Sequence, residues 1–469
     1  MSAVIKSMIT LREICNEAET IRLTNQNSLG DKIVSDIYAN AEIIANLAVS
    51  RKNSEQPSLD SRLDDILTSR LFGFPIMLLL LSGIFWLTIT GANLPSKMIG
   101  TILFAFQDQL VLWFTLAGAP NWLTGVLVLG MYRSLAWVVA VMLPPMAIFF
   151  PLFTLLEDLG YLPRIAFNLD NMFKKCQACG KQILTMCMGF GCNAAGIVAC
   201  RIIDSPRERL IAVLTNNFVP CNGRFPTMIA IATIFMGGIV ASEYEIAVAS
   251  LVITCLVILG ILVTFAVSWA LSHTILKGET SSLVLELPPY RKPQFGGILY
   301  RSIIDRTIFV LKRAMIMAAP AGAITWILAN VYIGELNIIA HLAAYLHPLA
   351  YAIGLDGFIL LAFILGLPAN EIVVPILLMS YLSSGQILEF SSLTELREIL
   401  VNNGWTWLTA VCTLLFCLLH WPCTTTLLSA YKETGSRKWT FLTFLLPTII
   451  GFTVCFIVAQ SVRILGLIP

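Results

Sequence analysis

The stretch Gly189-Phe190-Gly191-Cys192-Asn193, followed by Pro220-Cys221-Asn222-Gly223-Arg224, decides how this chain folds. Both pieces lie in runs that are apolar enough to sit in a bilayer. They nevertheless contain Gly and Pro, which interrupt a helix, and Cys and Asn, whose side chains can bind ligands. Non-helical backbone at membrane depth persists only where protein buries it or where it lines a cavity. The two pieces are therefore predicted to form walls of an internal site.

Composition indicates an integral membrane protein. Hydrophobic residues make up 57% of the sequence and charged residues 12%, against about 25% charged residues in soluble domains. The net charge of +2 is too small to indicate nucleic acid as a partner; membrane lipid is the expected surrounding. No charged n-region with a short apolar core opens the chain, so we expect no signal peptide. The predicted fold class is an all-α, polytopic membrane protein.

Apolar runs of about 20 residues predict membrane-spanning helices. Residues 1–70 are expected to form cytoplasmic amphipathic helices with a loop at 53–57. Segment 98–132 is apolar but broken by Gln107-Asp108-Gln109, so it is expected to lie along the membrane interface. Runs 183–200 and 357–380 look interrupted and are predicted to be re-entrant. Full spans are predicted near 73–92, 134–157, 210–237, 246–273, 314–331, 405–431 and 440–462.

Lys and Arg in short loops predict the orientation. The basic residues before the first span favour a cytoplasmic N-terminus, and those of loop 158–182 favour the same side. Loop 332–356 has neither Lys nor Arg and is expected outside. The predicted segments are a cytoplasmic helical segment (1–70), a first span with an interfacial segment (71–133), repeat one (134–276), a cytoplasmic linker (277–313) and repeat two (314–469).

An internal repeat relates the two halves. Short motifs recur in the same order, and a Pro precedes the motif Asn by 48 residues in one copy and 50 in the other. The second copy holds a polar insert at 381–404. The basic loops predict that the copies enter the membrane from opposite faces, and inverted repeats with broken helices are typical of transporters. The matched pairs are Pro145 with Pro320, Gly189 with Gly366, Asn193 with Asn370, and Pro220-Cys221 with Pro422-Cys423.

The interrupted segments hold side chains that can bind metals. Thiolate, imidazole and carboxylate groups ligate borderline divalent metals such as Fe²⁺, Co²⁺ and Zn²⁺. A permeating ion must be held strongly enough to lose water, yet weakly enough to leave. A mixed ligand set suits this better than a closed Cys₄ cage, which is structural. The predicted metal ligands are Cys192, Cys221, Cys423 and Glu371; the predicted path residues are Asn193, Asn370, His420, Thr424, Glu157 and Asp158.

Each candidate also has a plainer interpretation. The cysteines could be packing residues, although the matched Pro-Cys positions favour function. A carboxylate within a membrane segment costs roughly 2.5–3.5 kcal/mol on insertion scales, so Glu371 is interpreted as functional, with placement at the interface as the alternative. His420 is more typical of a hydrogen-bonded core histidine. Glu157 and Asp158 end a span and are more typical of solvated groups.

Two further features have alternatives. Cys176-x-x-Cys179 is either a redox or metal-capture pair or incidental, and the second interpretation is favoured because no further ligand pair lies nearby. Pro220 and Pro422 each free a helical carbonyl about one turn earlier. Those carbonyls are additional candidate ligands beside the Cys residues.

These motifs resemble the membrane domain of ferrous iron transport protein B. The resemblance covers about residue 58 to the C-terminus and rests on the order and spacing of many segments. The segments that carry it are Leu59–Thr68, Leu156–Asp170, Gly189–Asn193, Arg201–Leu210, Pro220–Arg224, Glu286–Tyr290, Pro368–Glu371 and His420–Cys423.

The resemblance implies a transporter rather than an enzyme, importing Fe²⁺ as its substrate across a bacterial plasma membrane through paired Gate repeats. It implies Cys192, Cys221 and Cys423 as iron ligands. The family carries a GTP-binding domain before its membrane part, whereas no Gly-x-x-x-x-Gly-Lys-Ser/Thr loop occurs in this sequence. We therefore expect no nucleotide site on this chain. Either a small GTP-binding protein docks in trans on residues 1–70, or transport is not coupled to nucleotide.

The resemblance leaves further alternatives open. A small soluble accessory protein and a second copy of the chain are additional candidate partners. The Gate repeat is also called a nucleoside-recognition repeat, so the alternative function is transport of a nucleoside or another organic solute. Such a site would use Asn193 and Asn370 rather than thiols. A third hypothesis is a membrane sensor that transports nothing.

Overall fold

The computed structural model describes residues 16–17, 20, 29–48, 59–69, 71–176, 179–237, 245–278, 290, 292–383, 385 and 393–466. The predicted loop at 53–57 and motif residues 286–289 lie outside this part of the chain. Within it, regular structure is helical except for a short hairpin of β1 (Tyr332–Ile333) and β2 (Leu336–Asn337). The all-α prediction is therefore confirmed.

The helices follow one another along the chain with short connections, and η marks a 3₁₀ or π-helical segment. The first half contains α2 (Leu29–Ala48), α3 (Leu59–Leu67), α4 (Gly73–Leu116), α5 (Asn121–Thr124), η2 (Gly125–Tyr132), α6 (Arg133–Asp158), α7 (Tyr161–Lys175), α8 (Gln182–Gly191), α9 (Asn193–Ala199), η3 (Cys200–Ile202), α10 (Pro206–Thr215), η4 (Asn216–Phe218), α11 (Phe225–Ile231), η5 (Ala232–Met236) and α12 (Glu245–His273). The second half contains α13 (Phe295–Tyr300), η7 (Arg301–Ile308), α14 (Phe309–Asn330), α15 (Ile338–Ala352), α16 (Gly357–Leu365), η8 (Asn370–Ile372), α17 (Val373–Leu382), α18 (Leu393–Asn402), α19 (Trp407–Leu419), α20 (Thr424–Thr434) and α21 (Arg437–Ile464).

Several helices are long and apolar enough to cross a membrane. Among the described residues there are six, and a seventh if α15 and α16, which meet at 107°, count as one bent span. The predicted polytopic membrane protein is therefore confirmed. The six are Gly73–Leu116, Asn121–Asp158, Val248–His273, Phe295–Asn330, Trp407–Thr434 and Arg437–Ile464.

Segment 98–132 is not broken at Gln107-Asp108-Gln109, contrary to the prediction, whereas its placement along the membrane interface remains a prediction. Helix α4 continues through Pro95 to Leu116 as one helix of 44 residues, and residues 121–132 run directly into α6. The two stretches pack on each other, with the Tyr132 hydroxyl donating to the Leu103 carbonyl at 3.0 Å. Gln107, which looked like an interfacial break, is buried between helices. Asp108 and Gln109, which follow it, are exposed.

Two other predicted segments also differ. The predicted span 210–237 is divided, because the chain leaves the helix at Val219 and restarts at Phe225; Pro220 cannot donate a helical hydrogen bond. The predicted loop 332–356 instead contains α15, whose first turn is capped by Asn337 Oδ1 accepting from the Ala340 N–H at 2.8 Å. The insert at 381–404 likewise contains α18.

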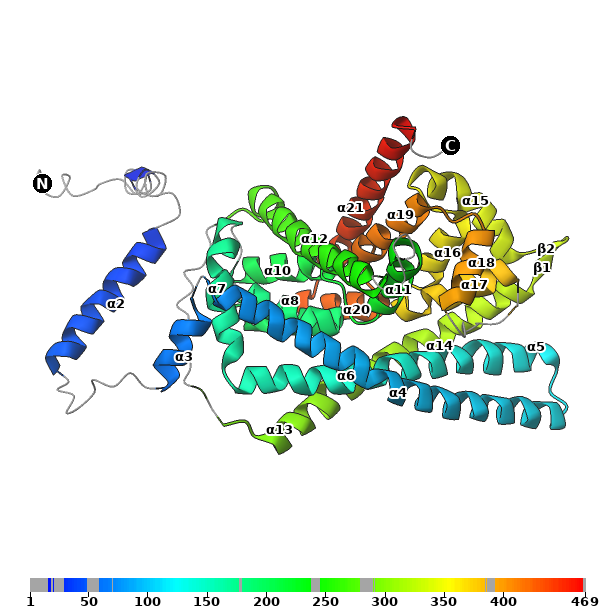
Figure 1. Cartoon of the computed structure of the whole chain (residues 1–469), viewed down its shortest axis with the longest axis horizontal. Coiled ribbons are helices and arrows are strands. Elements are labelled where there is room, and N and C mark those ends of the chain that lie inside the picture. Colours follow the sequence, from blue (N-terminus) through cyan, green and yellow to red (C-terminus); the bar gives the residue numbers. More distant parts are fainter. Residues whose placement is uncertain are drawn as a thin grey trace, which may run out of the picture.

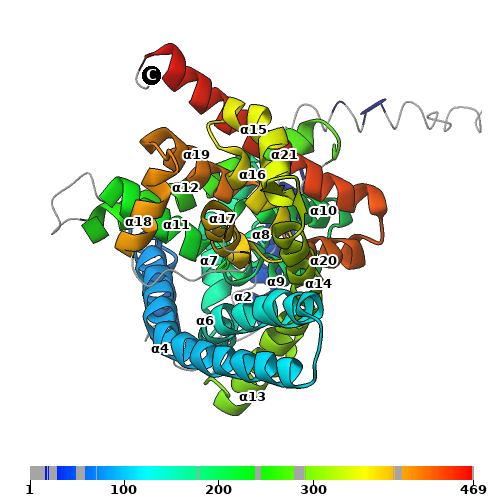
Figure 2. The same ribbon diagram turned by 90° about the vertical axis from the view of Figure 1, so that its right-hand side faces the viewer.

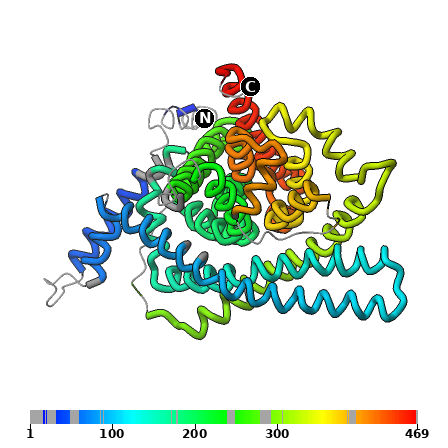
Figure 3. Tube along the Cα trace, turned by 45° about the vertical axis from the view of Figure 1, so that its right-hand side comes forward, coloured from blue at the N-terminus to red at the C-terminus, as the bar shows by residue number. Residues whose placement is uncertain are grey.

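The same order of elements occurs in both halves. Each half begins with a long helix that contains a motif proline, α6 or α14. Two interrupted helix pairs follow: α8–α9 and η4–α11 in the first half, and α16–η8 and α19–α20 in the second. The interrupted helices gather in the middle of the molecule (Figure 2), and the two halves pack side by side (Figure 3). Opposite insertion of the halves remains a prediction.

The N-terminal helices are only partly joined to this body. Helix α2 lies apart from it, whereas α3 contacts it (Figure 1). Arg164 of α7, whose side chain is 1% exposed, pairs with Asp64 of α3 at 3.0 Å. Tyr290 donates its hydroxyl to the same carboxylate at 2.7 Å, and its ring lies against the guanidinium. The hydrogen bond from Arg164 lowers the pKa of Asp64 below its usual value.

Candidate functional site

A small cavity lies where the four interruptions meet the two long helices. The space in it that is open to the centre of a water-sized sphere is roughly 30 Å³, more than the about 10–15 Å³ that one buried water needs. We call it the central cavity. Its walls are Met142, Met146, Gly191, Cys192, Asn193, Cys221, Asn222, Gly223, Val310, Ala314, Pro368, Ala369, Asn370, Glu371, Cys423, Thr425 and Thr426.

The backbone has nearly the same conformation at matched interruptions. Cys192, just before Asn193, has φ −158° and ψ 123°. Ala369, just before Asn370, has φ −153° and ψ 118°. Cys192 directly follows α8, whereas Ala369 is separated from α16 by a turn at 366–368; each is followed by a helical segment that begins with a motif Asn at the cavity. The sequence repeat is therefore also a repeat of local geometry at the site.

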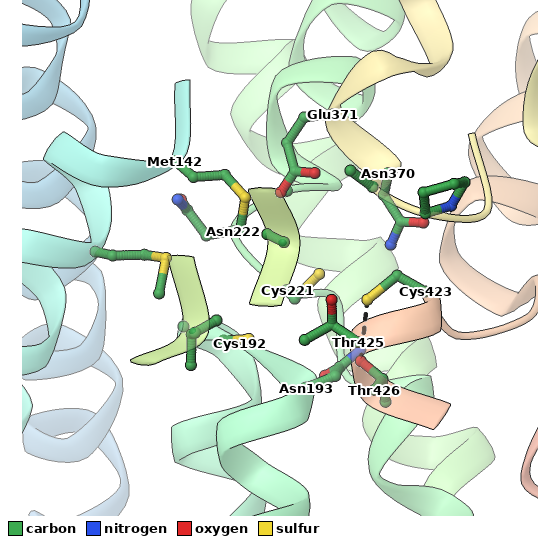
Figure 4. A pocket seen from close by; sticks show the side chains of 17 residues that line it. Met142, Cys192, Asn193, Cys221, Asn222, Asn370, Glu371, Cys423, Thr425 and Thr426 are labelled. Atoms are coloured by element: carbon green, nitrogen blue, oxygen red, sulfur yellow. Dashed lines mark hydrogen bonds between the residues drawn. The ribbon is translucent and has the colours of Figure 1, made fainter. Parts of the chain in front are cut away.

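The four predicted metal ligands all line the central cavity. Cys192 and Cys221 are each 9% exposed, whereas Cys423 and Glu371 are partly buried. Figure 4 shows their side chains arranged around the same space. The Cys423 thiol lies 3.1 Å from the Thr426 hydroxyl.

These side chains do not form a closed ligand cage. Across the described residues, no three His, Cys, Asp or Glu side chains are placed so that they could hold one metal ion together. The walls instead offer donors around a shared space, and direct coordination by Cys192, Cys221, Cys423 and Glu371 remains a prediction.

Glu371 is placed in the cavity by close packing. Its carboxylate lies against Gly223, at a position that a Cβ would occupy. Its carbonyl oxygen accepts from the indole N–H of Trp137 at 3.3 Å. Glu371 therefore brings an acidic group from the second half onto the interruption of the first half.

The two motif Asn residues line the cavity and brace its walls. In the amide orientation that satisfies its hydrogen bonds, Asn193 donates to the carbonyls of Gly189 and Val219, both at 3.1 Å. Its own carbonyl accepts from Asn216 at 3.1 Å. Asn370 Oδ1 lies 3.4 Å from His420 Nε2. Both amides thus connect one interruption to the segment beside it.

Four predicted path residues do not line the central cavity. His420 is buried, and its Nδ1 lies 3.0 Å and 2.9 Å from two carbonyls of its own helix, as in a core histidine. Thr424 donates to the Leu367 carbonyl, while the next two threonines face the cavity. Glu157 pairs with Arg306 at 2.9 Å. Glu157 and Asp158 end α6, roughly 20 Å along it from Met142.

Met142 and Met146 are cavity residues that were not predicted from the sequence. They lie one turn apart on α6 and present thioethers to the space that also holds the three thiols. Thioethers favour soft metals. Their spacing is visible in the sequence, but a Met pair at helical spacing is usually a packing feature.

The carbonyls freed by the two prolines are already occupied. Pro422 leaves the Leu418 carbonyl without its helical donor, and Arg224 donates to that oxygen at 2.7 Å. Pro220 leaves the Asn216 carbonyl, which accepts from the Val219 N–H at 3.3 Å. Neither Asn216 nor Leu418 lines the central cavity, and the interpretation of these carbonyls as additional ligands remains a prediction.

The Cys176-x-x-Cys179 pair lies away from the central cavity. Cys179 packs in a cluster with Ile197 and Cys200. Burial raises the pKa of Cys179 to about 11 and also raises that of Cys176. Thiolate, which is the form that reacts and binds metals, is therefore scarce here at neutral pH.

Comparison with known proteins agrees with this architecture. The family model described as nucleoside recognition (Gate) matches residues 139–235 and 300–437, together half of the chain. Each matched range contains one copy of the interrupted helices. The model described as ferrous iron transport protein B C terminus matches residues 253–305. No solved structure matches the chain.

Relatives that match nearly the whole of this chain were also found. The chain is 28% identical to Fe(2+) transporter FeoB of Staphylococcus aureus, over 97% of this chain and 69% of that protein. It is 25% identical to Fe(2+) transporter FeoB of a Synechocystis species, over 97% and 71%. For the protein of that name from Methanocaldococcus jannaschii the identity is 26%, over 98% and 65%. The chain therefore belongs to the Gate family and corresponds to the membrane part of ferrous iron transport protein B.

Proposed function

We propose that this chain is the permease subunit of a ferrous iron transporter and that Fe²⁺ passes through the central cavity. The observation that carries the proposal is a cavity of roughly 30 Å³ lined by three thiols, two thioethers and one carboxylate. A space of that size admits a metal ion that has shed most of its water. The relatives named Fe(2+) transporter FeoB support the choice of metal.

The donor set suits transient binding of a borderline cation. Sulfur ligands favour transition metals over Mg²⁺ and Ca²⁺, and Glu371 supplies negative charge where water is displaced. Asn and Thr oxygens in the walls replace hydration only weakly. Because no three strong ligands converge in the described residues, an ion passed from one donor to the next can leave again.

Transport of a nucleoside or another organic solute is the alternative. The description of the Gate family and the amides of Asn193 and Asn370 in the cavity wall favour it. The cavity volume opposes it, because sites for small organic molecules measure about 300–1,000 Å³. Uptake of a labelled nucleoside into proteoliposomes, unaffected by excess Fe²⁺, would support this alternative.

The proposed cycle needs relative movement of the two halves. We place the N-terminus in the cytoplasm and the chain in the bacterial plasma membrane, with the halves inserted in opposite directions and rocking around the central cavity. A small GTP-binding protein in trans would act through α2 and α3. The Asp64–Arg164 pair gives α3 a rigid connection to α7, through which movement of the partner could be transmitted.

Iron uptake into proteoliposomes tests the proposal. Purified protein with Cys192→Ser, Cys221→Ser or Cys423→Ser should take up Fe²⁺ at least about tenfold more slowly than wild type if each thiol contributes one metal bond, since loss of even a supporting group at a metal site costs about 10–100-fold. Cys255→Ser is the matched control, because Cys255 is exposed on α12 and outside the cavity. Undiminished Fe²⁺ flux in all three cavity variants would refute the thiol path. Absence of any flux in wild type would favour the sensor hypothesis.

A further inference from the structure

Arg224 is a buried cation outside the set of cavity donors. Its side chain is 0% exposed, and it ends the interruption that follows Pro220. The guanidinium donates several hydrogen bonds, all to neutral oxygens. The acceptors are the carbonyls of Asn217 (3.0 Å), Leu418 (2.7 Å), His420 (3.3 Å) and Trp421 (3.3 Å), and Oδ1 of Asn217 (3.0 Å).

Three of these acceptors belong to the other half of the protein. Leu418 lies in the last turn of α19, and His420 and Trp421 form the interruption after it. The C-terminal end of a helix carries carbonyls without N–H partners and a partial negative charge. Pro422 removes one further donor. The guanidinium of Arg224 thus caps α19 from the opposite half and supplies hydrogen bonds that Pro422 cannot.

Asn217 holds the guanidinium in place. Its Oδ1 accepts from Arg224, while its Nδ2 donates to the His420 carbonyl at 2.8 Å. Both residues therefore reach the same interruption in the second half. Trp421 is two residues from Cys423, and the Arg224 N–H donates to the Cys221 carbonyl at 2.9 Å. The network connects the backbone beside one cavity thiol to the backbone beside the other.

We infer that Arg224 is the positioning residue that fixes Cys221 and Cys423 on a common wall of the central cavity and serves as the pivot between the two halves. The pivot role rests on the proposed function, because it assumes that the halves move during transport. The positioning of the two thiols does not. An arginine suits this role because its planar fork can bond several carbonyls at once and remains charged when buried.

A second contact between the halves involves an arginine that is exposed rather than buried. Arg201, in η3 after α9, forms a bidentate pair with Glu433 near the end of α20, with both distances 2.7 Å. Arg201 is 68% exposed and Glu433 7%, so water already reaches the guanidinium and can replace its bonds when they break. Helices α9 and α20 pack together and both begin at the cavity. The halves would therefore part at the Arg201 end while the Arg224 end stays closed.

Thiol bridging measures the proposed positioning directly. In full-length Cys192→Ser protein, brief oxidation with iodine, a reagent of only two atoms, should bridge Cys221 and Cys423 as a disulfide that mass spectrometry of the peptides detects, with Cys192→Ser/Cys423→Ser giving the background. Adding Arg224→Lys keeps the positive charge but removes the planar guanidinium and its several N–H donors. Bridging per folded molecule should then fall about tenfold, as expected when several charge-assisted hydrogen bonds are lost. Absence of bridging in the parent protein, or full bridging in the Lys variant, would overturn the inference.

Further variants separate positioning from folding. Asn217→Ala removes a single brace and should reduce bridging in the same direction but less, so it replaces Arg224→Lys if that protein does not fold. Arg201→Gln is the matched control and should leave bridging unchanged; an equal loss there would overturn the assignment of the pivot. Size-exclusion chromatography gives the amount of folded protein for each variant.

Uptake kinetics complete the test. Arg224→Lys should raise the KM for Fe²⁺ more than it lowers kcat, because the thiols lose their alignment. A merely structural role would lower the amount of active protein and leave the KM and the bridging yield unchanged. Bridging needs no metal, so its outcome can be interpreted even if the transported solute is not Fe²⁺.

Discussion

The carboxylate of Glu371 rests on the bare backbone of Gly223, so that a Cβ at position 223 would overlap Oε1. The two residues come from different halves of the chain and are 148 positions apart. Gly223 is thus needed for the space that it leaves, because its backbone is not in the left-handed region. The carboxylate of Glu371 can occupy this position only because Gly223 has no side chain.

Gly223→Ala should therefore displace Glu371 and impair transport. We expect Fe²⁺ uptake to fall by about tenfold or more, since a misplaced functional group of this kind commonly costs about 10²-fold. Uptake into proteoliposomes is the measurement. Gly83→Ala is the matched control, because a Cβ at position 83 meets nothing within 4 Å. Equal uptake by both variants would show that the position of Glu371 does not matter.

The thioethers of Met142 and Met146 should influence which metal is carried. Met142→Leu/Met146→Leu keeps the apolar volume, for which a cost below about 1.5 kcal/mol per site is usual, but removes two soft donors. We expect the KM for Fe²⁺ to rise several-fold and the preference for Fe²⁺ over Mn²⁺ to shrink. Competition uptake with both metals measures this. Met172→Leu, outside the central cavity, should change neither.

The pair between Asp64 and Arg164 should stabilise the attachment of α3. Asp64→Ala leaves a guanidinium that is 1% exposed without its acid, which is itself 25% exposed, and losing hydrogen bonds to a charged group of this kind costs about 1.5–3 kcal/mol. Thermal unfolding in detergent should show a lower Tm. Asp65→Ala, at the exposed neighbouring position, should leave the Tm nearly unchanged. The same Tm in both variants would contradict a stabilising pair.

The same pair should make stability depend on acid pH. Because the pKa of Asp64 is lower in the folded protein than its ordinary 3.8, the folded state binds this proton less readily than the unfolded chain does. The stabilisation is complete above about pH 4 and is lost as pH falls through the lower, folded pKa. The Tm of wild type should fall over this range more steeply than the Tm of Asp64→Ala. Parallel curves would remove Asp64 from the acid response.

The thiol of Cys179 should be unreactive at neutral pH. Burial raises its pKa to about 11, so a maleimide should label it slowly at about pH 7 and faster as the pH rises toward that value. The same thiol in the denatured chain, where its pKa returns to about 8.5, is the comparison. Mass spectrometry of the labelled peptides gives both rates. Rapid labelling of Cys179 at neutral pH would restore the redox or metal-capture interpretation.

The interruptions could be predicted from the sequence because Pro220, Pro422 and the Gly residues beside the motif Asn residues stand next to Cys and Asn within apolar runs. Proline alone would not have shown them, since Pro95, Pro145 and Pro320 lie inside continuous helices. The three Cys and Glu371 then share one cavity, because each stands directly at an interruption. The lengths of α4 and α6 were not predictable in the same way. Gln107 looked like a membrane boundary, whereas only the packing of α4 against its neighbour shows that it is covered.

Arg224 was missed for a related reason. Charge rules place Arg in loops at the membrane surface, and its acceptors in the second half lie 194 or more positions away as plain backbone carbonyls, which leave no mark in the sequence. Met142 and Met146 were missed because a thioether that faces a cavity looks the same in the sequence as one that fills a core. His420 was correctly interpreted as more typical of the core, and its bonds to the last turn of α19 explain why.

On the proposed path, the size of the central cavity limits how fast ions can pass. A hexahydrated cation carries six waters, whereas the space in the cavity that is open to the centre of a water-sized sphere is roughly 30 Å³, only about two to three times the ~10–15 Å³ that one buried water needs. Each ion must then shed most of its waters before it enters. We therefore expect slow transport of one ion per cycle, as in a carrier, rather than the rapid flow of ions through a channel. Hexaamminecobalt(III), which has the size of a hydrated ion but cannot release its ligands, should be unable to enter and should block only from outside.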